Sequence, residues 1–364
     1  MKRSKDIKIC TIVGARPQFI KSAPLSKYIQ SREGISEFII HTGQHFDANM
    51  SSVFFEQLNI PKPKYFLNIN GASHGEMTGR MLIEIEKILI KEKPKATIVF
   101  GDTNSTLAGA LAATKLNIPV IHIEAGLRSK NMLMPEEINR IMTDSISEVL
   151  FCPSEDSRTN LILEGLNNRA KIISVTGDIM HDSLKMIELT NKISSNFFHG
   201  EDFCLLTLHR AENVDNPDKL LNILNELNEL ARETNILFPV HPRTKSKIED
   251  LKINLDSKIR MIEPLGYFEM INAISSALLI ITDSGGLQKE AYFLNKYCLT
   301  VRDETEWVEL VQIGANVLVG SNANSLIKAF TLIKDKEFTV QKGIYGDGRS
   351  SQLIVEHIIE FLAS

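Results

Sequence analysis

Acidic and histidine side chains recur directly after apolar, strand-like segments of this chain. Asp102 and Glu124 do so in the first half of the sequence, and His209 and His241 do so in the second half. Carboxylates and imidazoles act as general acids and bases. Taken singly, each residue also fits a plainer role as a helix cap, a salt bridge or a hydrogen-bonded histidine at a strand end. Because ligands of parallel α/β sheets bind at the carboxyl ends of the strands, the recurrence favours proton-transfer chemistry at that edge.

A second pattern predicts an anion site. The segment 283–286, with the sequence Asp-Ser-Gly-Gly, joins an apolar run to a helical one. Backbone N–H groups at a helix start attract phosphate, and glycines let it approach the backbone closely. We therefore expect a phosphate or diphosphate at this segment, with a simple helix-start turn as the alternative. Arg16 and Lys21, after the first strand-like run, would add positive charge.

Two common nucleotide-binding motifs are absent from the sequence. It contains neither a Walker A motif nor the glycine fingerprint G-x-G-x-x-G. Their absence argues against a P-loop NTPase and against a standard dinucleotide enzyme.

The elements that must position these side chains follow an alternating pattern. Short apolar runs rich in β-branched residues alternate with longer helical patterns, which predicts an α/β fold with mainly parallel sheets. The expected strands are 7–13, 37–40, 96–100, 120–123, 149–152, 171–175, 203–208, 236–240, 260–262, 278–281 and 297–301. The clearest expected helices are 76–91, 104–116, 218–232 and 286–294.

The length of 364 residues predicts two domains, because it exceeds what one hydrophobic core normally serves. The strand and helix pattern restarts near residue 201, after the polar stretch 191–200. We predict two doubly wound, Rossmann-like domains over 1–180 and 181–350, with a cleft between them that forms the working site. Residues 351–364 have apolar side chains at helical spacing and are expected to pack back on the N-terminal domain.

Composition excludes several classes of protein. The chain has 41 basic and 45 acidic residues, a formal net charge of -4, and no basic stripe, which argues against a nucleic-acid partner. It has neither a secretory apolar segment nor a run of about 18 apolar residues, so we expect no membrane span and a cytoplasmic location.

Cysteine and histidine spacing predicts no metal site. The four cysteines are far apart and lie in or beside apolar runs, so we expect buried thiols: Cys10, Cys152, Cys204 and Cys298. His41 and His45 are four residues apart, but the residues between them indicate a turn and no third ligand follows at a zinc-like spacing.

Nine blocks of sequence, in order, resemble the non-hydrolysing UDP-N-acetylglucosamine 2-epimerase family, and the resemblance extends from about residue 7 to 362. The blocks are Gly14-Ala15-Arg16-Pro17, His41-Thr42-Gly43-Gln44-His45, Gly101-Asp102-Thr103, His122-Ile123-Glu124-Ala125-Gly126-Leu127-Arg128, Pro135-Glu136-Glu137-Ile138-Asn139-Arg140, His209-Arg210, Pro239-Val240-His241-Pro242, Thr282-Asp283-Ser284-Gly285-Gly286-Leu287-Gln288-Lys289-Glu290 and Tyr345-Gly346-Asp347-Gly348.

The resemblance implies a fold of the glycosyltransferase B type, with UDP held mainly by the C-terminal domain and the sugar facing the N-terminal one. It also implies inversion at C2 of a UDP-linked 2-acetamido sugar, without NAD or a metal. The C2 proton has no neighbouring carbonyl to acidify it. The family mechanism therefore eliminates UDP to give a 2-acetamidoglucal, to which UDP adds back with protonation on the other face. A homodimer is expected.

The resemblance assigns roles residue by residue. The catalytic groups it implies are Asp102, Glu124, Glu136 and His209, with the histidine placed to interact with the departing diphosphate. The substrate-binding residues it implies are Arg16, Lys21, Ser284, Gly285, Gly286, Glu290 and Arg302, of which Glu290 matches the position that binds the ribose hydroxyls. Gln44, Arg210 and His241 occupy positions related to a second, allosteric sugar-nucleotide site.

Departures from the family pattern bear on the substrate. UDP-N-acetylglucosamine epimerases typically have H-R-R-E where this chain has His209-Arg210-Ala211-Glu212, and T-T-E-R-P-E at 304–309, where it has E-T-E-W-V-E. The segment between Gly126 and Pro135 is also shorter. These features resemble the branch that acts on UDP-2,3-diacetamido-2,3-dideoxy-glucuronate, converting gluco to manno for surface polysaccharide. A UDP-N-acetylglucosamine 2-epimerase, a hydrolysing epimerase and a nucleotide-sugar glycosyltransferase remain alternatives.

Overall fold

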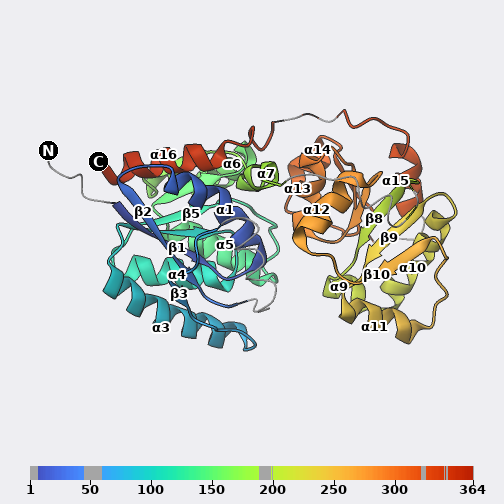
Figure 1. Ribbon diagram of the computed structural model, residues 1–364, viewed down its shortest axis with the longest axis horizontal. Helices are drawn as coiled ribbons and strands as arrows, with labels where there is room; N and C mark the ends of the chain where they lie inside the picture. Colours follow the sequence, from blue (N-terminus) through green and yellow to red (C-terminus); the bar gives the residue numbers. More distant parts are fainter. Residues whose placement is uncertain are drawn as a thin grey trace. The chain divides into compact units, whose positions relative to one another are not determined.

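The computed structural model describes residues 7–44, 60–187, 198, 200–320, 325–339, 341 and 343–363. The chain forms two compact units (Figure 1). Unit 1 comprises Met1–Met186 and Gly343–Ser364, and unit 2 comprises Ile187–Lys342. The chain therefore passes between the units near residues 186 and 342, compared with the boundaries at 180 and 350 expected from the sequence.

The sheet of unit 1 is parallel throughout, in the order β3-β2-β1-β4-β5-β6-β7. Its strands are β1 (Ile7–Val13), β2 (Ile35–His41), β3 (Tyr65–Phe66), β4 (Ala96–Phe100), β5 (Val120–Ile123), β6 (Val149–Cys152) and β7 (Ile172–Val175). The chain runs outward from β1 to β3 and then returns to the other side of β1 as β4. The switch point of this sheet, where ligands bind in such folds, therefore lies between β1 and β4.

The sheet of unit 2 repeats this plan. Its parallel strands have the order β10-β9-β8-β11-β12-β13. They are β8 (Phe203–Thr207), β9 (Asn235–Pro239), β10 (Ile259–Ile262), β11 (Ile280–Thr282), β12 (Cys298–Thr300) and β13 (Asn316–Leu318). The switch point here lies between β8 and β11, so these two strands correspond in topology to β1 and β4.

Helices connect the strands in both units. Unit 1 contains α1 (Arg16–Gln30), α3 (His74–Glu92), α4 (Asn104–Lys115), α5 (Pro135–Ile146), α6 (Glu155–Leu163), α7 (Ile179–Lys185) and α16 (Ser350–Ala363), with a short 3₁₀ turn at Leu166–Asn168. Unit 2 contains α9 (Ala211–Val214), α10 (Pro217–Ala231), α11 (Pro242–Leu251), α12 (Tyr267–Ser276), α13 (Gly285–Phe293), α14 (Val308–Gln312) and α15 (Ser325–Ile333).

The helices of unit 1 lie in two groups. Helices α1, α7 and α16 pack together, as do α3, α4 and α5, and Figure 1 shows the two groups on either side of the sheet. The strands between them are therefore buried on both faces, which is why β4 and β5 are buried along their whole length and are mostly apolar, with Thr97 and His122 as their polar residues. Each fully buried Ile, Leu or Val side chain there contributes about 1.5–3 kcal/mol to the stability of the core.

The last helix belongs to the first unit. Helix α16 packs on α1 and α7, and Asp182 of α7 caps its start. The Asp182 carboxylate accepts hydrogen bonds from the backbone N–H groups of Ser350 and Ser351, at 3.1 and 2.8 Å. Residues separated by some 170 positions in the sequence are therefore joined by a buried, charge-assisted cap.

Sequence periodicity missed two strands. β3 has two residues and β13 has three, whereas β11 and β12, which also have three, overlap the expected runs 278–281 and 297–301. β3 and β13 are paired at the edges of their sheets. Most of the expected strands and helices differ from the observed ones by one or two residues at their ends. The four cysteines are buried and free, as the apolar runs around them predict.

Candidate active site

Polar loops gather at the two switch points. In unit 1, Gly14 follows β1 and Asp102 follows β4, whereas in unit 2, His209 and Asp283 follow β8 and β11. Of the strand-end residues that the sequence singled out, Asp102 and His209 therefore lie beside the central pairs of strands, whereas Glu124 follows β5 and His241 comes shortly after β9. Each unit presents its own set of polar groups at this edge.

Gln18 fixes the two loops of unit 1 to each other. Its side-chain oxygen accepts from the backbone N–H of Gly14 at 2.8 Å, and its nitrogen donates to the carbonyl oxygen of Phe100 at 2.8 Å and to the Thr106 hydroxyl at 2.9 Å. The side chain is 2% exposed, so all of these groups depend on it. Sequence reasoning missed Gln18, although its position directly after the first block of the family pattern was a usable signal.

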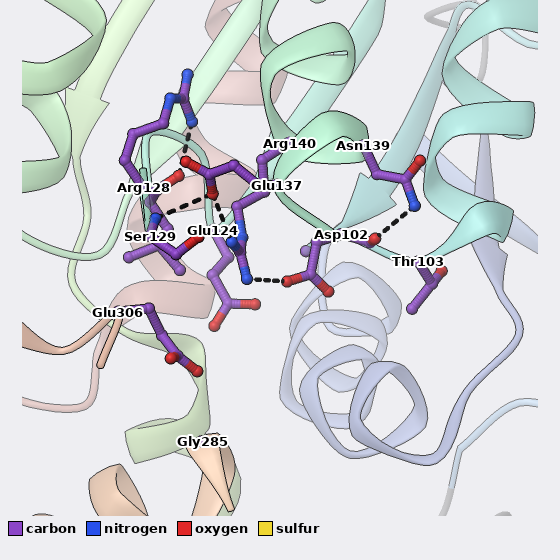
Figure 2. Close-up of polar contacts among 12 residues, drawn as sticks. Asp102, Thr103, Glu124, Arg128, Ser129, Glu137, Asn139, Arg140, Gly285 and Glu306 are labelled. Carbon is purple, nitrogen blue, oxygen red and sulfur yellow. Dashed lines mark hydrogen bonds and ion pairs between the residues drawn. The ribbon is translucent and has the colours of Figure 1, made fainter. Parts of the chain in front are cut away.

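Asp102 is held by helix α5, as Figure 2 shows. Nη2 of Arg140 donates to its carboxylate at 2.6 Å. The amide nitrogen of Asn139 donates to the backbone carbonyl of Asp102 at 2.9 Å. The side chain of Asp102 is 30% exposed, so one edge of the carboxylate remains open to a substrate.

Burial raises the pKa of the Asp102 carboxyl above its ordinary value. The positive charge of Arg140 opposes this effect, the negative charge of Glu124 adds to it, and the positive charge of Lys21 opposes it. A carboxyl group whose pKa is raised is suited to carry a proton at one step and release it at another.

The backbone of Glu124 has a conformation that residues other than glycine rarely adopt. Its φ of +73° lies in the left-handed region, at a cost of about 1–2 kcal/mol. The residue is 8% exposed, its carboxylate forms an ion pair with Nζ of Lys21, and one carboxylate oxygen would lie 3.1 Å from a Cβ placed on Gly101. Strained positions of this kind concentrate at functional sites, where the surroundings hold them in place.

The two neighbouring glutamates of α5 differ completely in environment. Glu136, which the family resemblance implies as catalytic, is exposed in the first turn of the helix. Glu137 is 1% exposed and accepts hydrogen bonds from Arg140 and from the backbone N–H groups of Ser129 and Lys130. Sequence reasoning did not single out Glu137, although helical spacing places it on the same face as Arg140.

A buried polar cluster lies behind Asp102. His122 of β5 lies between the Gly101 carbonyl oxygen, at 2.8 Å from Nε2, and the Asp144 carboxylate, at 2.7 Å from Nδ1. Asp144 in turn forms an ion pair with Arg128 at 2.8 Å. Because His122 and Asp144 are completely buried, this cluster fixes the Gly101 turn that precedes Asp102.

His209 pairs with the buried Asp283 in unit 2. Its Nδ1 lies 3.0 Å from the Asp283 carboxylate, and its side chain is 49% exposed. The contact orients the ring and leaves Nε2 as the nitrogen that faces away from the partner. Asp283 also accepts from the backbone N–H groups of His209 and Arg210, at 3.0 and 2.9 Å.

The pKa of the Asp283 carboxyl lies below its ordinary value. Burial alone would raise it, but the hydrogen bond and charge of His209, together with the backbone N–H groups of Arg210 and His209, more than offset that effect. Asp283 is therefore a fixed anion that positions His209. The sequence reasoning placed Asp283 in the anion-binding segment but did not assign it this role.

The anion-binding segment forms the start of α13. Ser284 precedes the helix, and Gly285 and Gly286 are its first two residues. A Cβ on Gly285 would lie 2.2 Å from the Glu306 carboxylate, so a larger residue there requires the Glu306 side chain to move. Nε1 of Trp307 donates to the Gly285 carbonyl oxygen at 2.9 Å, which fixes the first turn of the helix from the other side.

Arg302 and Glu290 are both buried near this helix. Nη1 of Arg302 forms an ion pair with Glu306 at 2.9 Å, and Glu290 of α13 is 5% exposed. The neighbouring Lys289 has its ammonium group 3.8 Å from the centroid of the Trp307 ring. The E-T-E-W-V-E segment, which departs from the family pattern, is therefore packed directly against the predicted diphosphate site.

The candidates for a second sugar-nucleotide site have separate surroundings. The side-chain oxygen of Gln44 accepts from the N–H and hydroxyl of Ser105, at 2.9 and 2.7 Å. Arg210 donates through Nε to the Asp283 carbonyl oxygen at 3.2 Å, and His241 is an exposed cap of α11. Gln44 lies in unit 1 and the other two in unit 2, so their joint role stays a prediction.

Some predicted positions fall outside the described part of the chain. The side chain of Arg16 and the residues from His45 to Met50 belong to this group. His41 is buried between the rings of Phe19 and Phe66, and burial lowers its pKa to about 4. Across the residues that the structure describes, no group of three or more His, Cys, Asp or Glu side chains is arranged to hold a metal ion.

In the described ranges, none of the helices has the length and apolar character needed to cross a membrane.

Comparison with known proteins identifies the relatives of this chain. Residues 27–359 match the family model described as UDP-N-acetylglucosamine 2-epimerase. The UDP-2,3-diacetamido-2,3-dideoxy-D-glucuronate 2-epimerase of Pseudomonas aeruginosa is 51% identical over 97% of this chain and 99% of its own length. The UDP-N-acetylglucosamine 2-epimerase of Methanocaldococcus jannaschii is 46% identical over 96% of this chain and 98% of its own length.

Solved structures give the same result. The crystal structure of the M. jannaschii enzyme in complex with UDP-GlcNAc and UDP has a TM-score of 0.87 to this chain and covers 97% of it, with 99% of that enzyme matched. The Neisseria meningitidis UDP-GlcNAc 2-epimerase bound to UDP-GlcNAc has a TM-score of 0.85 at 33% identity, and the match covers 97% of this chain and all of that one. These similarities include the architecture of both sheets.

Proposed function

This chain belongs to the UDP-N-acetylglucosamine 2-epimerase family, and we propose that it inverts C2 of UDP-2,3-diacetamido-2,3-dideoxy-glucuronate from gluco to manno. The observation that carries the choice of substrate is the 51% identity, over nearly the whole of both chains, to the P. aeruginosa enzyme of that name. Such an isomerase would supply a precursor for surface polysaccharide.

The acids of unit 1 are proposed to move the C2 proton. The C2 proton has no neighbouring carbonyl to acidify it. We propose that a base removes it as the C1–oxygen bond to UDP breaks. The electron pair of the C–H bond then becomes the double bond of a 2-acetamidoglucal. Asp102 and Glu124 are supported in this role by partial or full burial and by their positive partners, Arg140 and Lys21. Glu136 is proposed as a third acid, on the family resemblance.

The polar groups of unit 2 are proposed to hold UDP as it leaves and returns. The start of α13 offers N–H groups and glycine backbone to the diphosphate, and His209 offers Nε2 while Asp283 orients its ring. Buried Glu290 is proposed to bind the ribose hydroxyls, and Arg302 and Arg16 to balance phosphate charge. Each well-placed donor of this kind contributes about 3–4 kcal/mol to stabilising the transition state.

Incubation in deuterated water tests this function. The protein is mixed with UDP-2,3-diacetamido-2,3-dideoxy-glucuronate, without added cofactor, and followed by proton and phosphorus NMR. We expect deuterium at C2 of both epimers while UDP remains attached to the sugar. Absence of C2 exchange with any UDP-2-acetamido sugar would refute the epimerase proposal. Accumulation of free UDP and free sugar would instead identify a hydrolysing enzyme, and transfer to an acceptor without exchange would identify a glycosyltransferase.

UDP-N-acetylglucosamine is the second candidate substrate. The 46% identity to the M. jannaschii enzyme over 96% of this chain favours it. The two substrates differ at C3 and C6, where the proposed one has an acetamido group and a carboxylate. A ratio of kcat/KM values measured with both compounds decides between them, and a higher value for UDP-N-acetylglucosamine would overturn the choice of the uronate.

We also propose that the enzyme is a homodimer. Ile83 and Ile90 lie one heptad apart on α3 and are 51% and 54% exposed, and Ile138 and Met142 on α5 are 40% and 45% exposed. Both helices pack on α4, so these apolar side chains belong to one group of helices. Light scattering should give the mass of a dimer, and the Ile83→Glu/Ile90→Glu variant should give that of a monomer.

The cytoplasm is the proposed location. Four free, buried cysteines are typical of proteins kept in a reducing compartment. Cell fractionation with antibodies to the chain tests this, and recovery in the periplasmic or secreted fraction would contradict it.

A further inference from the structure

The Glu137 carboxylate binds both the backbone of the turn at Ser129 and Lys130 and the side chain of Arg140. Its Oε1 accepts from the backbone N–H of Lys130 at 2.8 Å, and its Oε2 accepts from the backbone N–H of Ser129 at 2.9 Å. The same Oε2 lies 2.7 Å from Nη1 of Arg140. Because only 1% of the residue is exposed, these contacts are shielded from solvent, and losing one leaves a buried polar group without its partner.

Arg140 is shared between two carboxylates. Nη1 faces Glu137 and Nη2 faces Asp102, at 2.7 and 2.6 Å (Figure 2). The guanidinium is 6% exposed, so its single positive charge is divided between the two acids with little screening by solvent. Burial would raise the pKa of Glu137, but the N–H groups of Ser129, Arg140 and Lys130 together hold it below its ordinary value. Glu137 is therefore the ionised partner of this buried pair.

We propose that Glu137 is a positioning residue for Asp102, acting through Arg140. Its carboxylate holds one side of the guanidinium and neutralises part of its charge, so that the other side orients Asp102 without keeping it permanently ionised. The inference rests on the proposed function for its consequence in turnover, but the structural claim concerns only Asp102, Arg140 and Glu137. Glu136, next to it in sequence, makes a matched contrast because it is exposed.

The charges that face Asp102 come from three elements. Arg140 comes from α5, Glu124 from the loop after β5, and Lys21 from α1. Burial raises the pKa of Asp102 while Arg140 opposes the rise. Removing the charge of Glu137 would leave Arg140 wholly to Asp102, which would favour the ionised carboxylate. The weaker base that results would remove the C2 proton more slowly.

Glu137 also links Asp102 to the segment that is shorter than in the UDP-N-acetylglucosamine enzymes. The turn at Ser129–Asn131 is held by the two N–H groups bound to Glu137, and Lys130 in it has a φ of +60°. The Lys130 side chain is exposed. A substrate group that contacts this turn would therefore act on the same carboxylate that shares Arg140 with Asp102.

The test is a pH titration of the Asp102 side chain by NMR in protein labelled with carbon-13 at the aspartate carboxyls. The Asp102→Asn variant identifies the signal, and no substrate is needed. In Glu137→Gln, which keeps the shape of the side chain, we expect the Asp102 midpoint to fall by about one pH unit. An unchanged midpoint or a rise would overturn the proposal.

Glu164→Gln is the matched control. Glu164 accepts two hydrogen bonds of 2.7 Å from Arg128 and its side chain is 38% exposed. Its replacement therefore removes a carboxylate from another guanidinium of the same unit, while Arg128 keeps Asp144 and Arg140 keeps both of its partners. We expect its Asp102 midpoint to equal that of the wild type. Glu137→Asp, which keeps the charge, should restore most of the midpoint lost in Glu137→Gln.

If Glu137→Gln fails to fold, a second pair of variants still tests the proposal. Arg140→Gln and the double variant Glu137→Gln/Arg140→Gln should have the same Asp102 midpoint, because Glu137 acts through Arg140. Replacing both members of a buried pair is less disruptive than removing one. Unequal midpoints would contradict the proposed route.

The pH dependence of turnover separates the two proposals. If the wild type is active, the acid limb of the kcat/KM profile should lie at lower pH in Glu137→Gln than in the wild type. A purely structural role would reduce the rate without moving the limb. A shifted NMR midpoint in a protein that exchanges no C2 proton would refute the proposed function and leave the role of Glu137 intact.

Discussion

Asp102 and Asp283 lie in corresponding loops of the two sheets, and the pKa values of their carboxyl groups are shifted in opposite directions. Each follows the strand that returns beside the central one, β4 in unit 1 and β11 in unit 2. The pKa of Asp102 is raised, with burial as the main cause, whereas that of Asp283 is lowered although burial opposes it.

The difference lies in the number and type of hydrogen-bond donors. Asp102 receives one guanidinium, and the neighbouring Glu124 repels its charge. Asp283 receives the backbone N–H groups of His209 and Arg210, and the His209 ring as well. The comparison teaches that corresponding loops shift the pKa of an aspartate upward in one unit and downward in the other, according to the donors around the carboxylate.

Asp102→Asn should have the largest effect. The amide cannot remove a proton, so we expect turnover to fall by roughly 10²–10⁴-fold, the range for loss of a general acid or base. UDP affinity, measured by calorimetry, should remain within about threefold of the wild type, since the diphosphate site is assigned to unit 2. A loss of turnover below about tenfold would show that Asp102 is not an essential proton carrier.

His209→Ala should have the next largest effect. Removing a group that stabilises charge on the departing UDP should lower turnover roughly 100-fold, while UDP still binds. The variant is also compared in the dependence of kcat/KM on pH. His209→Ala should leave the acid limb of that profile where it is in the wild type, because Asp102 is intact. Near-normal turnover in this variant would remove His209 from the mechanism.

The variants Gly285→Ala and Gly286→Ala test how much room for a side chain exists at the start of α13. A Cβ on Gly285 would lie 2.2 Å from the Glu306 carboxylate, which Arg302 holds in place, so we expect a loss of about 1–3 kcal/mol in the free energy of unfolding. A Cβ on Gly286 has its nearest atom at 4.0 Å, and alanine there should be neutral or stabilise by up to about 1 kcal/mol.

Urea unfolding followed by the fluorescence of Trp307 measures both variants, because this is the only tryptophan in the chain and it lies in unit 2. Equal stability of the two variants would show that Glu306 moves aside without cost.

The smallest expected effect is in the pH dependence of stability. The pKa of Asp283 is lower in the folded chain than in the unfolded one, so its contribution is fully present above about pH 4 and is lost as the pH falls through the folded value. Asp283→Asn should therefore flatten the acid side of the unfolding curve, by at most about 1.4 kcal/mol per pH unit.

Asp102 should behave in the opposite way. Because its pKa is raised in the folded state, ionisation of Asp102 opposes folding increasingly as the pH rises through that value. Acid unfolding is followed at Trp307 for Asp283→Asn, which lies in the same unit, and by far-ultraviolet circular dichroism for Asp102→Asn, because Trp307 does not report on unit 1. A steeper acid loss in Asp283→Asn would contradict the assignment of its carboxylate.

The strand ends were largely predictable from the sequence. Mostly apolar runs such as 96–100 and 120–123 end where the structure ends β4 and β5, because a parallel strand buried on both faces is predominantly apolar and the loop after it carries the polar groups. Asp102, Glu124, His209 and Asp283 are thereby placed at the carboxyl edge from pattern alone. The two-residue strand β3 was out of reach, since it is defined by its pairing with β2.

Tertiary structure alone determined which polar groups meet. The sequence by itself established the α/β class, the strand-end positions and the family pattern, because these depend on local apolarity and on the order of residues. It could not show that Glu137 rather than Glu136 is the buried glutamate of α5, nor that Arg140 divides its charge between Glu137 and Asp102. The burial of Glu137 and the Arg140–Asp102 and His209–Asp283 contacts arise only when the chain is folded, because they bring together groups from different elements. Burial and these contacts together account for the opposite pKa shifts of Asp102 and Asp283.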